Sequence, residues 1–203
     1  MTRRAFLRRA TVLCAALAPL LVGRPVGAAD PQPVTILVTY HSATGNTEKM
    51  AQGVADGARG VAGTTIVLKR VGDVTADDLS ASDAVIIGSP VYFANMSGEV
   101  KTFLDSWSLK FRLFQAQKMR NKVGAAFATG AAPSAGKELT ILSILAAMLN
   151  NQMIIVSGGG GFGASATTGP DSPGIDDKEL ASARDLGKRA AEITAVVKKG
   201  SAR

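Results

Sequence analysis

Short apolar runs alternate along the chain with longer segments in which apolar residues recur at helical spacing. The runs lack the in-and-out alternation of half-exposed strands, which indicates strands that are buried on both faces. They span residues 34–40, 65–71, 84–88, 123–129 and 153–157. The segments of helical spacing span residues 46–60, 97–114, 137–150 and 176–199. The acidic stretch 74–80 either replaces a second long helix or contains a short one.

This alternation predicts a single α/β domain over residues 30–203. Strands joined by helices form a doubly wound parallel sheet, because right-handed crossovers place helices on both faces. We therefore expect a three-layer sandwich around a five-stranded parallel sheet. A glycine-rich segment, residues 158–174, follows the fifth predicted strand, and its length indicates a functional or irregular loop more than a packed one.

Residues 1–29 have the organisation of an export signal. Basic residues at the start precede an apolar stretch from Ala10 to Val22 and small residues that suit cleavage after Ala28 or Ala29. The segment Thr2-Arg3-Arg4-Ala5-Phe6-Leu7 resembles a twin-arginine signal, which exports folded proteins. A membrane anchor is the alternative, but the apolar stretch is shorter than the roughly 20 residues that span a bilayer. We therefore expect a periplasmic protein.

The signal also accounts for most of the positive charge. The chain has 23 Lys and Arg residues against 16 Asp and Glu residues, a net charge of +7. Residues 1–29 contain five arginines and no acidic residue, so their removal lowers the net charge to about +2, which argues against a nucleic-acid partner. The only cysteine, Cys14, is removed as well, so the mature chain has no disulfide and no thiolate ligand. With a single histidine left, no metal site is predicted.

The loop Ser42-Ala43-Thr44-Gly45-Asn46-Thr47 joins the first predicted strand to the first predicted helix. It places three hydroxyls, a glycine and an amide at a helix N-terminus, where backbone N–H groups and the helix dipole favour an anion. It lacks the lysine of a triphosphate-binding loop and the glycine spacing of a dinucleotide fingerprint, so a single phosphate monoester fits better. A plain helix cap built on Thr44 or Thr47 is the alternative interpretation.

Two further loops follow the third and fourth predicted strands. Pro90-Val91-Tyr92-Phe93-Ala94-Asn95 offers aromatic faces and amide groups that suit a flat polar ring, although its aromatic residues could instead close the core. Thr129-Gly130-Ala131-Ala132 has small residues that let backbone N–H groups approach a ligand. Because ligands of such sheets bind beyond the carboxyl ends of the strands, these loops are predicted to share one site with residues 42–47.

Together the three loops resemble those of the flavodoxin-like family. Gly88-Ser89-Pro90, Asn95-Met96-Ser97-Gly98 and Thr102-Phe103-Leu104-Asp105 resemble, more specifically, the WrbA group of FMN-dependent NAD(P)H:quinone reductases. The resemblance implies a strand order of 2-1-3-4-5 and an FMN cofactor. It places residues 42–47 on the FMN phosphate, residues 90–95 along the ring, and residues 129–132 at the ring edge or the ribityl chain. It also implies reduction of quinones or similar acceptors by NAD(P)H, in dimers or tetramers.

The departures from the WrbA pattern keep a second function open. Tyr92 stands where that pattern has an arginine, and Asn150-Asn151-Gln152 stands where it has a histidine. NAD(P)H is scarce outside the inner membrane, so a flavodoxin-type carrier that accepts electrons from a membrane partner is the alternative. The near-neutral mature chain favours the enzyme, because such carriers are usually acidic. A flavin-free scaffold is a third interpretation.

Two aromatic residues near these loops have interpretations of their own. His41, the sole histidine, precedes the first loop and is interpreted as a partly exposed strand-end residue and not as a ligand to the flavin or the phosphate. Trp107 belongs to an apolar stripe at helical spacing, which is typical of a core or a subunit interface.

Overall fold

The computed structural model describes residues 33–158, 161–169 and 174–201, and the predicted export signal lies outside them. In chain order the elements are β1 (Val34–Tyr40), α1 (Asn46–Arg59), β2 (Thr64–Arg70), the 3-10 helix η1 (Val71–Asp73), α2 (Ala76–Ala81), β3 (Ala84–Tyr92), β4 (Asn95–Met96), α3 (Gly98–Leu109), β5 (Val123–Gly130), α4 (Lys137–Asn150), β6 (Ile154–Ile155), β7 (Ala164–Thr167) and α5 (Asp177–Ser201). The predicted alternation is confirmed, and the acidic stretch contains the short helix α2. Within the described residues, no helix has the length and apolarity needed to cross a bilayer.

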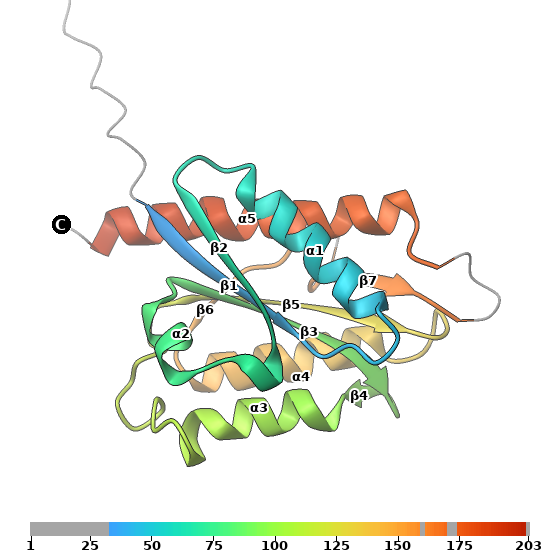
Figure 1. Ribbon diagram of the computed structural model, residues 1–203, viewed down its shortest axis with the longest axis horizontal. Helices are drawn as coiled ribbons and strands as arrows, with labels where there is room; N and C mark the ends of the chain where they lie inside the picture. The colour runs from blue at the N-terminus through green and yellow to red at the C-terminus, as the bar shows by residue number, and fades with distance from the viewer. Residues whose placement is uncertain (1–32, 159–160, 170–173, 202–203) are drawn as a thin grey trace, which may run out of the picture. The chain divides into compact units, whose positions relative to one another are not determined.

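The strands form one sheet in the order β2-β1-β3-β5-β6, and all the pairs along this path are parallel. Numbered as predicted strands, this is the order 2-1-3-4-5, so the predicted flavodoxin-like topology is confirmed. The strand order reverses between β1 and β3, and the carboxyl ends of β1, β3 and β5 are neighbours at one end of the sheet (Figure 1). Ligands of doubly wound sheets bind at such a switch point.

The fifth strand differs from the prediction because it is split. The predicted run forms only β6, which pairs with the start of β5, and the chain then leaves the sheet and returns as β7 beside the end of β5. Gly163 makes the return possible, since a Cβ there would overlap the carbonyl oxygen of Ala126 in β5. The glycine-rich segment therefore contains a strand of the sheet.

Further elements differ from the predicted ranges. β3 extends to Tyr92, four residues beyond the predicted end at 88. β4 pairs antiparallel with the end of β3 and closes a hairpin on the second predicted loop. α3 ends at Leu109, five residues short of the predicted 114. The following turns contain Arg112 (φ 58°), Gln117 (φ 51°) and Asn121 (φ 64°), backbone conformations that do not continue an α-helix.

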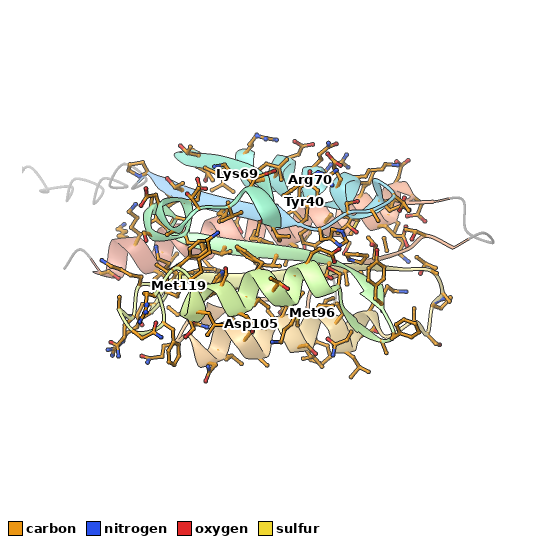
Figure 2. The ribbon with its side chains drawn as sticks, turned by 60° about the horizontal axis from the view of Figure 1, so that its bottom comes forward. Tyr40, Lys69, Arg70, Met96, Asp105 and Met119 are labelled. Carbon is orange, nitrogen blue, oxygen red and sulfur yellow. The ribbon has the colours of Figure 1, made fainter. Side chains whose placement is uncertain are left out.

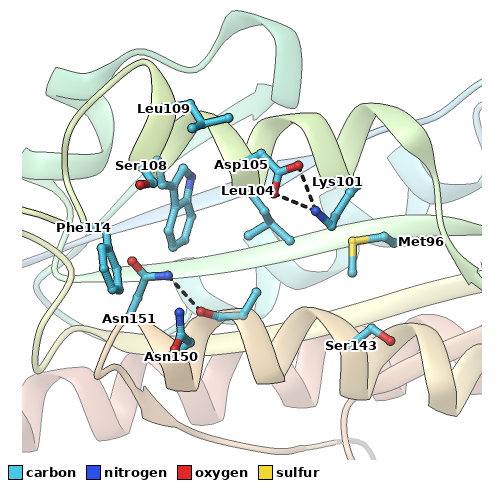
Figure 3. Close-up of a pocket in the computed structure, with 12 residues that line it drawn as sticks. Met96, Lys101, Leu104, Asp105, Ser108, Leu109, Phe114, Ser143, Asn150 and Asn151 are labelled. Atoms are coloured by element: carbon cyan, nitrogen blue, oxygen red, sulfur yellow. Dashed lines mark hydrogen bonds and ion pairs between the residues drawn. The ribbon is translucent and has the colours of Figure 1, made fainter.

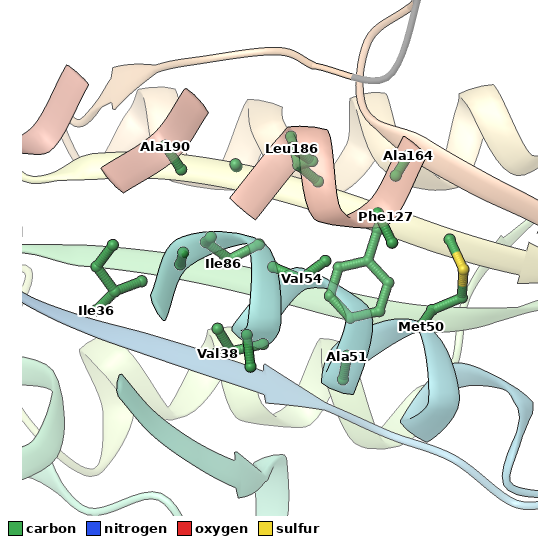
Figure 4. Close-up of a cluster of buried hydrophobic side chains, with 14 of the residues drawn as sticks. Ile36, Val38, Met50, Ala51, Val54, Ile86, Phe127, Ala164, Leu186 and Ala190 are labelled. Atoms are coloured by element: carbon green, nitrogen blue, oxygen red, sulfur yellow. The ribbon is translucent and has the colours of Figure 1, made fainter. Parts of the chain in front are cut away.

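Two hydrophobic cores lie between the layers. Helices α1 and α5 cover one face of the sheet, and α3 and α4 cover the other (Figure 1). Figure 4 shows the first core, where α1 and α5 contribute Met50, Ala51, Val54, Leu186 and Ala190 against Ile36, Val38, Ile86 and Phe127 of the sheet. On the opposite face Trp107 is 1% exposed and packs edge-on against Phe103, which confirms its interpretation as a core residue.

Glycines bring α1 and α5 into backbone contact. A Cβ on Gly187 of α5 would overlap the carbonyl oxygen of Val54 in α1, and a Cβ on Gly57 of α1 would overlap the carbonyl oxygen of Arg184 in α5. Close backbone approach of this kind requires residues without a side chain. It fixes α1, and with it the loop that precedes α1, against the longest helix of the fold.

The start of α2 gives a prediction about stability and pH. Thr75 and Asp78 form a capping box, and Lys69 pairs with Asp78 at 2.8 Å. The hydrogen bond from Lys69, together with those from Thr75, holds the pKa of Asp78 below its ordinary value. We expect Asp78→Asn to lower the free energy of unfolding at pH 7 by about 1–2 kcal/mol.

The sign of the pH dependence follows from the lowered pKa. Asp78 stabilises the fold above about pH 3.8, its ordinary pKa, and this contribution is lost as the pH falls through the lower pKa of the folded state. Denaturant melts of the two apoproteins should therefore differ at pH 7 and converge below that range. Asp77→Asn, an exposed change in the same turn, is the control, and an equal loss in both variants would contradict the role given to Asp78.

Candidate cofactor site

Three loops meet at the carboxyl ends of β1, β3 and β5. They are the first loop (residues 42–47), the second loop (residues 90–95) and the third loop (residues 129–136), and they contain all the residues predicted to bind a cofactor. Sheet order brings them together, because β3 lies between β1 and β5. Their side-chain chemistry decides what such a site can hold.

The first loop presents open donors at the start of α1. Gly45 is the N-cap residue in the left-handed conformation (φ 86°), and no side chain caps the helix. The alternative of a plain cap on Thr44 or Thr47 is therefore wrong. The first N–H groups of α1 have no partner within the helix, and a Cβ on Gly45 would meet nothing within 4 Å. This helix N-terminus is thus suited to an anion.

Buried hydroxyls connect the first loop to the third. Thr47 and Thr129 are 1% and 4% exposed, and their Oγ1 atoms lie 2.8 Å apart. One hydroxyl uses its proton in this hydrogen bond, so the proton of the other is left for a third group. Ser42 is also buried, and its Oγ accepts a hydrogen bond from the N–H of Gly45 at 3.1 Å. This Oγ therefore keeps its own proton to donate.

The second loop is a tight hairpin with an aromatic residue at its tip. Phe93 (φ 49°) and Ala94 (φ 61°) both have left-handed backbone conformations, which cost non-glycine residues roughly 1–2 kcal/mol each. The Phe93 side chain is fully exposed, and Tyr92 is 43% exposed, so neither closes the core. A Cβ on Gly136 of the third loop would lie 2.7 Å from the Cα of Ala94 in the second loop, so these two loops are in contact. Backbone strain concentrated in an exposed tip is typical of ligand sites.

His41 joins the first loop to the second. Its Nδ1 lies 3.0 Å from Ser97 Oγ and 3.4 Å from Glu99 Oε2, and its ring packs edge-on against Tyr92 at 6.2 Å. His41 directly follows β1 and is partly exposed, which confirms the prediction, and these contacts give it a bridging position in addition. Buried Ser97, which donates its N–H to Ser89 Oγ at 2.9 Å, belongs to the same network.

Arg70, at the end of β2, hydrogen-bonds to the first loop. It is not among the residues that the sequence predicts for the site. Its guanidinium donates to the carbonyl oxygen of Ser42 at 2.9 Å and to Glu48 at 2.6 Å, and it lies over the ring of Tyr40 at 5.6 Å (Figure 2). Burial raises the pKa of Tyr40, and the hydrogen bond to Glu48 adds to the increase. The phenol is therefore neutral at physiological pH. Arg70 and Tyr40 therefore both bind the carboxylate of Glu48, which directly follows the first loop.

Two cavities lie beside the site but not within it. One of about 730 Å³ is bounded by Tyr40, His41, Arg70 and the start of α3. The other, of about 540 Å³, runs between α3 and α4 (Figure 3), where Lys101 pairs with Asp105 at 2.6 Å. Neither is lined by a predicted cofactor-binding residue.

The residues present fit FMN. Phosphate requires donors without a competing carboxylate, and the first loop supplies an uncapped helix N-terminus and hydroxyls. A flat ring requires exposed aromatic and backbone surface, which the second and third loops supply through Tyr92, Phe93 and the exposed Ala131 and Ala132. The fold and this donor set together define a flavodoxin-like flavoprotein.

Comparison with known proteins agrees with that class. The NADPH-dependent FMN reductase family matches residues 33–167, and this chain belongs to that family. This membership confirms FMN as the cofactor. An NAD(P)H dehydrogenase (quinone) from Archaeoglobus fulgidus is 34% identical over 187 residues, covering 78% of this chain and 96% of the relative. One from Chromohalobacter salexigens is 31% identical over 197 residues, covering 79% and 96%.

Solved structures give the same fold. A flavodoxin, WrbA-like protein from Agrobacterium tumefaciens superposes with a TM-score of 0.67 at 26% identity, over 82% of this chain and 98% of that one. A flavodoxin from the domain Archaea superposes with a TM-score of 0.64 at 22% identity, over 79% and 99%. These likenesses do not assign individual contacts, so the cofactor-binding residues given above remain predictions that rest on the geometry.

The role of Arg70 can be tested through FMN affinity. We expect Arg70→Met to weaken FMN binding about three- to tenfold, because Glu48 loses its positively charged partner next to the phosphate site. Adding Glu48→Gln should restore most of the affinity, since the uncompensated charge is then gone. Titration of the apoproteins, followed by quenching of FMN fluorescence, measures both effects. Arg59→Met, which breaks an exposed pair with Asp56 on the same helix, is the control. A double variant as weak as Arg70→Met would contradict this account.

Proposed function

We propose that the protein is an FMN-dependent oxidoreductase that reduces quinones or similar small acceptors with electrons from NAD(P)H. The observation that carries the proposal is the meeting of the three loops, joined by the Thr47–Thr129 hydrogen bond and by the contact of Ala94 with Gly136. Membership of the FMN reductase family, and relatives named NAD(P)H dehydrogenase (quinone), support it.

In this proposal FMN supplies the two-electron redox chemistry, and the chain binds and orients it. Ser42, Thr44 and Thr47 hold the phosphate with the first N–H groups of α1. The hairpin of Tyr92 and Phe93 bounds the ring, and the third loop bounds its edge. No side chain is required as an acid or base, since quinone reduction can draw its protons from solvent.

We further propose that residues 1–29 export the folded, FMN-loaded protein to the periplasm by the twin-arginine route, and that it forms dimers or tetramers. The signal-like sequence supports the first proposal, and the resemblance to the WrbA group supports the second. Fractionation of cells that produce the chain with Arg3 and Arg4 both changed to lysine tests the first, because the mature form should then disappear from the periplasm. The molar mass in solution tests the second.

A carrier that accepts electrons from a membrane partner is the second candidate. Tyr92 favours it, since this ring packs against His41 at the position where the WrbA pattern has a fixed cation. Without that cation, recruitment of a nicotinamide dinucleotide by charge is weaker.

One experiment separates the two candidates. The mature protein is purified, its visible spectrum is recorded, and NADH or NADPH is added with benzoquinone. The enzyme predicts a flavin spectrum and quinone-dependent oxidation of the nicotinamide. A flavin spectrum without nicotinamide oxidation would leave the carrier, and a colourless protein that takes up no added FMN would overturn both.

A further inference from the structure

Lys137 is a buried charge beside the cofactor site. It is the first residue of α4 and only 5% exposed, and among the described residues no other charged side chain is buried. A cation at a helix N-terminus opposes the helix dipole, so α4 itself gives no reason for a lysine there. Burial of a charge without compensation costs several kcal/mol, which requires that its surroundings stabilise it.

The surroundings of Lys137 suit the protonated amine. Its Nζ donates to the carbonyl oxygens of Ala132 and Pro133 at 3.0 and 3.2 Å and to Thr167 Oγ1 at 2.9 Å. Three acceptors match the three N–H donors of an ammonium group, whereas a neutral amine has two. No carboxylate among the described residues forms an ion pair with Lys137, so dipoles provide its direct contacts. Glu179 lies one residue further away, since its Oε1 accepts a hydrogen bond from the N–H of Thr167 at 2.7 Å.

This ammonium lies beneath the third loop. Ala132 is a predicted cofactor-binding residue, and Thr167 belongs to β7, which pairs with the end of β5. The alkyl stem lies against Gly130, where a Cβ would be 3.0 Å from Lys137 Cγ. Lys137 therefore connects three segments: the third loop, the start of α4 and the returning strand β7.

We propose that Lys137 is a positioning residue that orders the third loop and supplies a positive charge favouring the reduced cofactor. The proposal rests on the proposed function only in that FMN occupies the three loops. Reduction adds electron density to the ring system, and a nearby buried cation stabilises the electron-rich form more than the oxidised one. The protein thus binds reduced FMN more tightly than it would without the charge.

The test compares three substitutions of Lys137 in the full mature protein. Lys137→Gln and Lys137→Met remove the charge, and Lys137→Arg keeps it. Lys188→Gln, on the exposed face of α5, is the matched control for loss of one positive charge. Each variant is measured for its affinity for oxidised FMN, by titration, and for its two-electron midpoint potential, by equilibration with a dye of known potential.

We expect each charge-free variant to lower the ratio of reduced to oxidised FMN affinity about tenfold, a decrease of about 30 mV in the potential. The arginine variant and Lys188→Gln should stay near the wild-type potential. A wild-type potential in either folded charge-free variant overturns the proposal. An equal decrease in the arginine variant also overturns it, because the effect would then come from the shape of the loop.

Failure of the proposed function would look different. If the wild-type protein binds no FMN, the site has been assigned wrongly. If the wild-type protein binds FMN and the charge-free variants keep its midpoint potential, only the role proposed for Lys137 is wrong.

Discussion

Replacing Thr44 and Thr47 together with alanine is expected to lower the affinity for FMN by about 10²- to 10⁴-fold. Each hydroxyl is predicted to donate a charge-assisted hydrogen bond to the phosphate, and such bonds contribute about 1.5–3 kcal/mol each. Thr47 should account for the larger part, because it is buried and its loss also removes the bond to Thr129 that joins the first and third loops. Thr44 is exposed, and its Oγ1 accepts a hydrogen bond from Asn46 at 3.2 Å.

Fluorescence titration of the apoproteins with FMN and, separately, with riboflavin measures this effect. Riboflavin lacks the phosphate, so its affinity should change much less, and the difference between the two ligands isolates the phosphate contacts. Thr65→Ala, at an exposed position of β2, is the control for removing a threonine elsewhere. Unchanged FMN affinity in the double variant would show that the phosphate lies at another place.

The second large effect concerns the contact between α1 and α5. Gly187→Ala is expected to lower the free energy of unfolding by about 3 kcal/mol or more, because the new methyl group must displace the backbone of α1 at Val54. Both helices are held by the sheet, so neither can withdraw without opening the core. Urea denaturation of the apoprotein measures the change.

Gly200→Ala is a sharp control for this prediction. Gly200 lies in the same helix, but a Cβ there would meet nothing within 4 Å. Alanine favours the helix over glycine, so this change should be neutral or stabilising by up to about 1 kcal/mol. The same substitution is thus predicted to have opposite signs at two positions of one helix, and a loss of similar size at both would refute the close contact as the cause.

The repeating units of the fold could be predicted from the sequence because their signals are local. The runs that became β1, β3 and β5 are mainly apolar and buried. The prediction that β2 is also buried on both faces was wrong, because β2 is an edge strand that contains Lys69 and Arg70 and is only partly covered. Helices α1, α4 and α5 agree with their predicted bounds to within two residues. The prediction of a single fifth strand was wrong, because two short strands, β6 and β7, pair with opposite ends of β5. Only Ile154–Ile155 kept the apolar signal, while β7, with the sequence Ala-Ser-Ala-Thr, is hidden by small residues.

The site could be predicted as a set of loops but not as a network. Residues 42–47 and 129–132 were recognised by their own composition, yet the bond between Thr47 and Thr129 depends on sheet order. Arg70 carries no local signal, since an arginine at the end of an edge strand is ordinary. Lys137 does carry one: a lysine at the first position of a helix opposes the dipole, and that anomaly could have identified it.

The bond between Thr47 and Thr129 has a consequence for how the protein is made. The two residues are separated by 82 positions, so at roughly 5–20 residues per second the ribosome completes the second about 4–16 s after the first. During that interval the loop before α1 exists without the strand that completes it. Capture of the cofactor between these two loops therefore requires that β5 has been synthesised. Any process that moves the polypeptide before β5 is in place would move it empty.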